Sequence, residues 1–228
     1  MVECLLPKEK VAGSSPVHRS NSFHNVTMNK RILYFIQQAG MLMQMPRTHH
    51  KNLGNTYDTV ASHSHHTSII AYSIARMEGL SHEKSLQAMS MATLHDLQEA
   101  RTGDFDYAGK HYSMKDEVKA INDTYADLEF GKDLQNLMIE YEKRVSPESR
   151  CAKDADLVEQ MYQEWVLMWQ GNKLAEKWFK SKQEYVVPKF YTKAAKQLIE
   201  GMITSNPQEW WWEEFVYKDF SSKNLTGR

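Results

Sequence analysis

The chain has 228 residues, a length at which a single domain can bury a complete core. Its 28 lysine and arginine residues balance 29 aspartate and glutamate residues, so net charge favours neither a nucleic acid polymer nor an anionic membrane as partner. No apolar run approaches the roughly 20 residues of a membrane-spanning helix, and two cysteines are too few for a disulfide framework, so we expect a cytoplasmic protein.

Residues 1–27 differ in texture from the rest of the chain. Turn-forming residues cluster there, as in Gly13-Ser14-Ser15-Pro16, without any apolar periodicity. We therefore expect residues 1–27 to be a disordered tail and residues 28–228 to form the folded domain.

Helical spacing of apolar residues dominates the next part of the chain. Pro46 should end a first helix, because proline disfavours the α conformation in the residue before it. Gly79 has the character of a C-terminal cap and Ser81 that of an N-cap. The pattern predicts helices over residues 28–45, 60–77 and 82–100, with a loop over 47–59.

The second half of the chain reads as helical too. Thr102-Gly103-Asp104 should break the third helix, and a loop should follow to about residue 112. Ser146-Pro147 is typical of a helix start. We expect the three consecutive tryptophans at 210–212 to pack back against the bundle. The remaining predicted helices are two within 113–143, then 147–169, 173–183 and 189–204, and because no strand pair is evident the predicted fold is an all-α, single-domain bundle.

The third helix ends in a dense group of metal-ligating side chains: His95, Asp96, Glu99 and Asp104. Neutral imidazole is the commonest metal ligand, and carboxylates beside it favour a borderline or hard divalent ion. His95 and Asp96 are adjacent, so their side chains diverge by about 100° and can reach one ion only near the helix end. We expect Glu99 one turn further on the same helical face, placed to act as a general acid or base.

Further ligands must come from other helices. His63 is the best candidate for a third ligand, because its helix precedes the 82–100 helix and can pack against it. A fourth is expected from Asp154 or Asp156. Asp154 lies on the axis of the apolar stripe of its helix, whereas Asp156 lies nearly opposite with Glu159, so spacing alone does not choose between them.

The other histidines carry weaker signals. His65 and His66 lie beside His63 and could serve a second metal ion. Taken singly, however, four of them are expected to be surface or loop residues rather than ligands: His49, His50, His65 and His82.

Four motifs between residues 30 and 170 resemble those of the HD-domain metal-dependent phosphohydrolases, on the branch that includes 5′-deoxynucleotidases. They are Pro46-Arg47-Thr48, Thr59-Val60-Ala61-Ser62-His63-Ser64, His95-Asp96-Leu97-Gln98-Glu99 with Thr102-Gly103-Asp104, and Lys153-Asp154-Ala155-Asp156-Leu157. The resemblance implies an HD-type helical bundle whose central cleft holds one divalent ion (Mn, Co, Fe, Ni, Zn or Mg). It implies as ligands His63, His95, Asp96 and Asp156, with Asp156 preferred to Asp154 because in the family the ligand precedes a Leu-like pair and an acidic residue.

The same resemblance implies roles in catalysis. Glu99 would be the general acid or base, Arg47 would hold the phosphate, and Asp104 would accept a hydrogen bond from a sugar hydroxyl. Two places depart from the family pattern. Ser62 stands where an acidic residue is usual, and His49-His50 replaces an aromatic residue that lies against the sugar. The resemblance therefore extends to metal binding but not to a preference for deoxyribose.

The sequence thus predicts a divalent-metal-dependent phosphohydrolase that releases phosphate from (deoxy)nucleoside 5′-monophosphates. A nucleoside triphosphate or pyrophosphate hydrolase is the alternative with the same chemistry, and it would need basic residues such as Arg101 and Lys110 besides Arg47. A non-catalytic metal- or nucleotide-binding regulatory module is the alternative from another class, and it would not need Glu99. The expected partner is a small-molecule phosphate ester, and the resemblance adds a homodimer.

Overall fold

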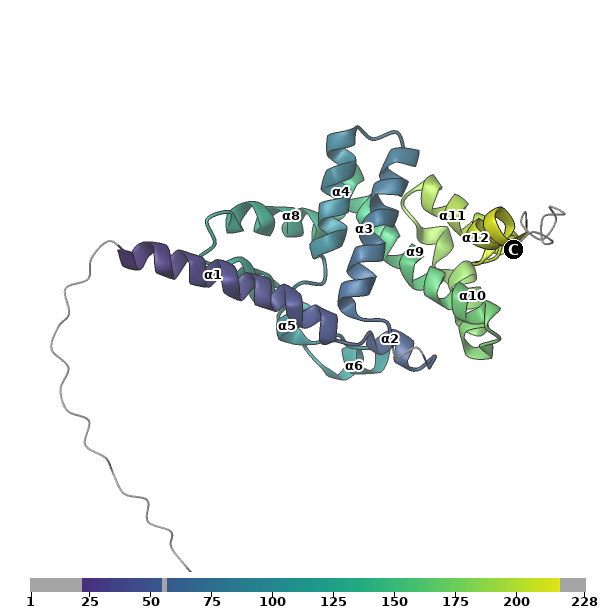
Figure 1. The fold of residues 1–228 in the computed structure, drawn as a ribbon, viewed down its shortest axis with the longest axis horizontal. Helices are drawn as coiled ribbons and strands as arrows, with labels where there is room; N and C mark the ends of the chain where they lie inside the picture. Colours follow the sequence, from purple (N-terminus) through teal and green to yellow (C-terminus); the bar gives the residue numbers. More distant parts are fainter. Residues whose placement is uncertain (1–21, 55–56, 218–228) are drawn as a thin grey trace, which may run out of the picture.

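The structure, a computed structural model, describes residues 22–54 and 57–217. Three long helices form its centre: α3 (Val60–Met77), α4 (His82–Leu94) and α9 (Pro147–Trp169) (Figure 1). α3 packs along both α4 and α9, and these two also contact each other. The described residues form no strand, only an isolated antiparallel bridge between Pro46 and Thr59. The predicted all-α fold is confirmed.

The other helices surround this centre. α8, α10 and α11 pack against α9, with α8 on one side of the central helices and α10 and α11 on the other (Figure 1). No helix in the described part of the chain is long and apolar enough to cross a membrane. The bounds are α1 (Ser22–Met41), η1 (Leu42–Gln44), α2 (Thr48–Lys51), α5 (Glu99–Thr102), α6 (Tyr107–Tyr112), α7 (Glu117–Tyr125), α8 (Gly131–Lys143), α10 (Lys173–Tyr185), η2 (Val187–Lys189), α11 (Lys193–Thr204), α12 (Glu209–Trp211) and the π-helical η3 (Trp212–Tyr217).

Capping residues determine where the central helices begin. Thr59 and Ser62 form a capping box at the start of α3, in which each side chain bonds to the other's backbone N–H. The side chain of Ser81 caps α4, and that of Ser146 caps α9 ahead of Pro147. All three helices begin where the sequence pattern predicts.

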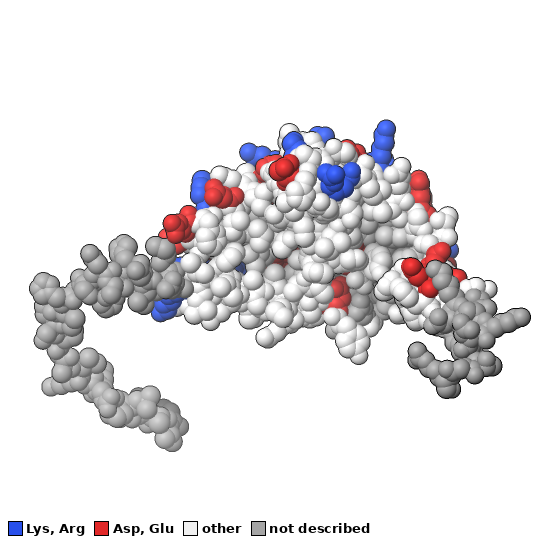
Figure 2. Space-filling view, turned by 45° about the horizontal axis from the view of Figure 1, so that its top comes forward, with Lys and Arg blue, Asp and Glu red and all other residues white. Residues whose placement is uncertain are grey.

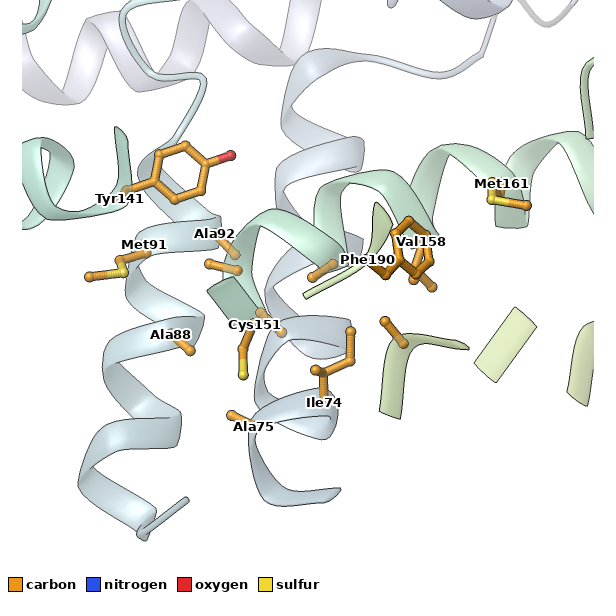
Figure 3. Close-up of a cluster of buried hydrophobic side chains, with 14 of the residues drawn as sticks. Ile74, Ala75, Ala88, Met91, Ala92, Tyr141, Cys151, Val158, Met161 and Phe190 are labelled. Atoms are coloured by element: carbon orange, nitrogen blue, oxygen red, sulfur yellow. The ribbon is translucent and has the colours of Figure 1, made fainter. Parts of the chain in front are cut away.

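Small side chains line the contacts between the central helices. Six fully buried alanines lie there: Ala71, Ala75, Ala88, Ala92, Ala152 and Ala155. Figure 3 shows some of them packed with the larger side chains of Ile74, Met91 and Val158. Because alanine allows helix axes to approach closely, polar side chains from three different helices can meet at one level of the bundle.

The beginning and end of α1 differ from the prediction. α1 begins at Ser22, inside the predicted tail, and no glycine or proline interrupts residues 22–39. The rest of that tail, residues 1–21, lies outside the described part of the chain. α1 ends at Met41, before Pro46, because the chain pairs at this point with the start of α3: the N–H of Val60 donates to the carbonyl of Met45 over 2.9 Å.

The third predicted helix is also shorter than expected. α4 ends at Leu94 rather than Ala100, and the N–H of Leu97 donates to the carbonyl of Leu94 in a tighter turn. The side-chain amide of Gln98 then donates a hydrogen bond to the carbonyl oxygen of His95 at 2.6 Å, so this carbonyl is not available to continue α4. Glu99 begins a separate helix, α5, so the expectation that it continues the face of one long helix is wrong.

Two further predictions fail outside the central helices. Residues 107–112 form α6 instead of a loop, because the side chain of Asp106 accepts a hydrogen bond from the N–H of Gly109 at 2.8 Å. Two of the three tryptophans at 210–212, Trp210 and Trp212, are exposed instead of packed back on the bundle, whereas Trp211 is half-buried. Trp210 is 72% exposed, and the rings of Trp211 and Trp212 contact each other edge to face.

Candidate metal centre and active site

Three buried side chains from the three central helices converge at one point. His63 comes from the second turn of α3, His95 follows the last residue of α4, and Asp156 lies in α9. Their ligand atoms all lie within 4.8 Å of one another. His63 Nε2 is 3.3 Å from His95 Nε2 and 3.3 Å from Asp156 Oδ1. These three residues are named the metal floor below.

The surroundings of each imidazole determine which nitrogen carries hydrogen. Nδ1 of His63 faces a carboxylate oxygen of Glu159 at 2.5 Å, and Nδ1 of His95 faces the carbonyl oxygen of Ala92 at 2.7 Å. Both partners are acceptors, so each Nδ1 must donate, and each neutral ring presents its Nε2 lone pair to the centre. Two lone pairs and the Asp156 carboxylate facing one another fit a cation between them. The metal floor could therefore hold a divalent metal ion.

Asp96 lies beside the metal floor. Its Oδ2 atom is 3.2 Å from Nε2 of His95 and 3.6 Å from Nε2 of His63. The same oxygen accepts a hydrogen bond from Arg47 Nη1 at 3.1 Å. This carboxylate is thus shared between the imidazoles and a guanidinium, and its assignment as a fourth ligand stays a prediction.

Charges around the metal floor favour a bound cation. Burial and the charge of Arg47 lower the pKa of His63, but Glu159 and Asp156 outweigh them and raise it to about 10. Burial opposes ionisation of Asp156, yet Lys153 and the two imidazoles hold its pKa well below the usual range. The site therefore attracts a proton strongly in the absence of metal, and a metal ion must displace that proton.

An open cleft of about 290 Å³ lies next to the metal floor. Arg47 enters it from the segment before α2, and its side chain is buried between Asp96 and Asp104. Asp104 in turn accepts a hydrogen bond from the N–H of Thr48 at 2.7 Å. The other basic and aromatic side chains that line the cleft are Lys110, Lys115, Arg144, Lys153, Phe105, Tyr107 and Tyr141.

Glu99 lies in this cleft with the features of a proton donor. It is 8% exposed, and its Oε1 atom is 3.8 Å from Lys115 Nζ. Burial, followed by the charges of Asp96 and Asp104, raises its pKa to about 8, and Arg47 and Lys115 oppose this only in part. A carboxyl group with such a pKa carries a proton at neutral pH and can act as a general acid.

Comparisons with known proteins agree with this geometry. The model of the HD domain family matches residues 39–202. The chain belongs to the HD-domain family. It is 31% identical over 140 residues to the 5′-deoxynucleotidase HDDC2 of Danio rerio, which spans 58% of this chain and 67% of that protein.

Two solved archaeal structures share the fold of this HD domain. A conserved hypothetical protein from Pyrococcus furiosus superimposes with a TM-score of 0.63 at 23% identity, over 76% of this chain and 99% of its own. A predicted coding region from Archaeoglobus fulgidus superimposes with a TM-score of 0.53 at 26% identity, over 80% of this chain and 99% of its own. The HD-type fold that the sequence motifs imply is therefore present.

The structure separates the two aspartates that spacing left undecided. Asp156 belongs to the metal floor, whereas Asp154 accepts hydrogen bonds from the N–H of Tyr191 and from both the N–H and the hydroxyl of Thr192. Asp154 thus ties α9 to the start of α11. Helical periodicity failed as a guide because α9 is covered on several sides, so the face opposite its apolar stripe is buried as well.

Several functional candidates escaped the sequence analysis. Glu159 is completely buried and holds Nδ1 of His63, a role that its place opposite the apolar stripe does not indicate. Lys115 and Tyr141 line the cleft without belonging to any motif. The family pattern, in which an acidic residue stands three positions after the aspartate ligand, was the signal that could have identified Glu159. Nothing in the sequence marks Lys115 or Tyr141.

The remaining histidines do not form a second metal site in the described part of the HD domain. His65 is exposed, and His66 contacts Glu159 through Nδ1 at 3.4 Å. His50 is completely buried, contrary to expectation, because its Nδ1 atom pairs with Asp58 Oδ2 at 2.9 Å. Asp58 also accepts a hydrogen bond from Ser62, the residue that departs from the family pattern.

Proposed function

We propose that this HD domain is a metal-dependent phosphohydrolase that releases phosphate from nucleoside 5′-monophosphates. One observation carries the proposal: imidazole lone pairs and a carboxylate converge at the floor of a cleft whose wall holds a buried, high-pKa carboxyl group, Glu99. The relative from Danio rerio supports the substrate class, because its name describes a 5′-deoxynucleotidase.

Each polar group around the cleft has a task in this proposal. A divalent ion held by the metal floor and Asp96 would polarise the phosphoryl group and activate a water molecule. The guanidinium of Arg47 binds phosphate oxygens by exchanging part of its contact with Asp96. Glu99 gives its proton to the leaving oxygen of the sugar, and Lys115 then faces the resulting carboxylate.

The aromatic side chains of the cleft suit a nucleoside. Phe105 and Tyr107 line the cleft, and the ring of Phe105 lies 4.4 Å from Lys115 Nζ, which holds it in place. We propose that they contact the base and sugar in place of the aromatic residue absent after Pro46-Arg47-Thr48. Asp104 would accept a hydrogen bond from a sugar hydroxyl.

The triphosphatase alternative has weaker support from the cleft. It requires additional basic side chains, and Lys110 does line the cleft. Arg101 does not: its guanidinium donates to the hydroxyl of Thr124 and the carbonyl of Asp123, so it holds α5 against α7. Only one of the two expected additional basic residues thus lines the cleft, so we expect triphosphates to be poorer substrates than monophosphates and include them for comparison.

The test is a substrate panel with matched variants. Protein loaded separately with Mn, Co, Ni, Fe, Zn or Mg is incubated with ribo- and deoxyribonucleoside 5′-monophosphates and triphosphates, and phosphate release is followed. We expect turnover of monophosphates, loss of metal and activity in Asp96→Ala, and loss of activity with metal retained in Glu99→Ala. Absence of turnover with every metal, or wild-type rates in both variants, contradicts the proposal.

We also propose that the protein forms a homodimer. Figure 2 shows a broad face whose middle carries few charged side chains. On α1 and the turn after it, Leu33, Ile36 and Met43 are 50–69% exposed, which is unusual for large apolar residues of one helical segment. Light scattering should give a dimer mass for the wild type and a monomer mass for Ile36→Asp.

A further inference from the structure

One buried phenol lies at the wall of the cleft and has no role in the chemistry described so far. Tyr141, near the end of α8, is 3% exposed and lines the cleft. Its ring packs against the imidazole of His95, with the ring centroids 5.7 Å apart. Figure 3 shows the ring at the edge of the buried cluster, with its hydroxyl directed away from Met91 and Ala88.

Nearby charges indicate what this hydroxyl faces. Burial raises the pKa of Tyr141 well above its usual value, and the carboxylates of Asp156 and Asp96 raise it further. The hydroxyl makes no hydrogen bond to any residue that the structure describes. The oxygen is not fully enclosed by protein, so the hydroxyl reaches the open space of the cleft and can donate there to a group that enters beside the metal floor.

Tyr125 provides the contrast. It is equally buried, at 1% exposed, and its ring packs against Phe35 in the core. Its hydroxyl also has no partner in the described part of the chain, but only burial raises its pKa and it does not line the cleft. The two tyrosines therefore differ in position: Tyr141 lines the cleft and its hydroxyl reaches the open space there, whereas the hydroxyl of Tyr125 is enclosed in the core.

A bound phosphate group would supply the missing acceptor. It brings three terminal oxygens, each of which needs a cation or a hydrogen-bond donor in place of water. Arg47 and an ion on the metal floor can serve two of them. Lys115 already donates to the carbonyl of Gly103, and Lys153 donates to Asp156 Oδ2 at 2.7 Å. Lys110 and Arg144 also line the cleft, and the hydroxyl of Tyr141 adds a neutral donor beside the metal floor that suits the third oxygen.

We propose that Tyr141 donates its hydroxyl hydrogen to a phosphoryl oxygen of the substrate and is a further catalytic residue of this site. The proposal rests on the phosphohydrolase function proposed above. A hydrogen bond to a charged phosphoryl oxygen is stronger than one between neutral groups, so its loss should be measurable both in binding and in turnover.

The experiment compares Tyr141→Phe with Tyr125→Phe, because each removes one phenol oxygen and leaves a buried ring in place. Metal content, Tm, kcat and KM for the best nucleotide are measured, together with calorimetric titration of metal-loaded protein with inorganic phosphate. We expect Tyr141→Phe to keep its metal and its Tm, to bind phosphate about 10-fold more weakly, and to lose about 10- to 100-fold in kcat/KM. Tyr125→Phe should match the wild type in metal content, phosphate binding and turnover.

The outcomes separate this proposal from the one on which it rests. Wild-type phosphate affinity in Tyr141→Phe overturns the donor role. The donor role is also overturned if Tyr141→Phe binds metal more weakly but binds phosphate normally at saturating metal. The hydroxyl would then support the metal-ligating side chains and not the phosphate. If the wild type hydrolyses no nucleotide, the proposed function fails, yet the phosphate titration still decides the matter. Weaker binding confined to Tyr141→Phe supports the donor, and a wild type that binds no phosphate overturns it.

Discussion

The metal floor and the rim of the cleft are built in different ways. His63, His95 and Asp156 are carried by or directly follow the long central helices, and each imidazole is held at Nδ1 by a buried acceptor. The rim comes from the short helices α2, α5 and α6 and the segments between them. Its charged groups hold one another, as in the contact of Arg47 with Asp96 at 3.1 Å. The core thus preorganises metal binding, whereas the rim consists of charge pairs that a substrate can rearrange.

The difference has a mechanistic consequence. A ligand of the metal floor has no replacement, because the alanine-lined contacts between α3, α4 and α9 leave no room for another residue to take its place. A rim residue acts through contacts that a neighbouring donor or a solvent molecule can partly supply. Substitutions on the metal floor should therefore abolish function, and substitutions on the rim should reduce it by degrees.

The largest effect is expected for Asp156→Asn, with Asp154→Asn as its matched control two residues away. Loss of the Asp156 charge should remove the metal and all measurable activity, as elemental analysis and phosphate release will show. Asp154→Asn should retain metal and activity but weaken the anchor to Thr192. We expect a cost of about 2 kcal/mol in stability, or roughly 4–8 °C in Tm. Equal metal loss in both variants would argue against the distinction.

Glu99→Gln should have the next largest effect. The amide cannot donate a proton to the leaving oxygen, so kcat should fall by about 10²- to 10⁴-fold while the metal stays bound. Metal content and kcat measured on the same preparation check this. Loss of metal in this variant would place Glu99 among the ligands and contradict its assignment to the rim.

The same residue predicts a pH dependence of stability in protein stripped of metal by EDTA. The folded-state pKa of about 8 lies above the ordinary value of 4.5, so the folded state holds the proton more tightly than the unfolded state. Stability from this group is fully present below pH 4.5 and is lost as the pH rises through about 8. Glu99→Gln should lack that loss, which amounts to a few kcal/mol in chemical denaturation between these pH values. An identical pH dependence in wild type and variant would contradict the raised pKa.

Glu159→Gln should weaken the metal floor without destroying it. Gln cannot hold Nδ1–H of His63 as strongly as a carboxylate at 2.5 Å does, so metal affinity should fall by about 10- to 100-fold. Activity should return at high metal concentration, unlike that of Asp156→Asn. Competition with a chromophoric chelator measures the affinity, and an unchanged value would show that Glu159 does not orient His63.

The parts of this molecule that could be predicted from sequence depend on local signals. The starts of α3, α4 and α9 were predicted correctly because capping residues act within one turn. His95 and Asp96 stood out because two ligand types are adjacent. The end of α4 could not be predicted, since it depends on the Gln98 side chain taking up a backbone carbonyl.

The rest of the site depends on contacts between distant segments. Glu159 and His63 are 96 residues apart, so helical spacing does not indicate that the carboxylate accepts from Nδ1 of His63. Only the family pattern, with an acidic residue three positions after the late aspartate, points to Glu159. Tyr141 occupies an apolar position of its helix, and only the packing of α8 beside His95 turns its hydroxyl toward the cleft. The burial of His50 could not be predicted either, because it depends on the pairing of its imidazole with Asp58.

Arg47→Lys should show the smallest effect and so test the rim most finely. The substitution keeps the positive charge but loses the planar fork, which can bind Asp96 and a phosphate oxygen at the same time. We expect KM for the nucleotide to rise about 10-fold, with metal content unchanged and kcat lowered less than by Glu99→Gln. Loss of metal in Arg47→Lys would mean that the guanidinium holds Asp96 in place for the metal, and the division between floor and rim would then pass through Asp96 itself.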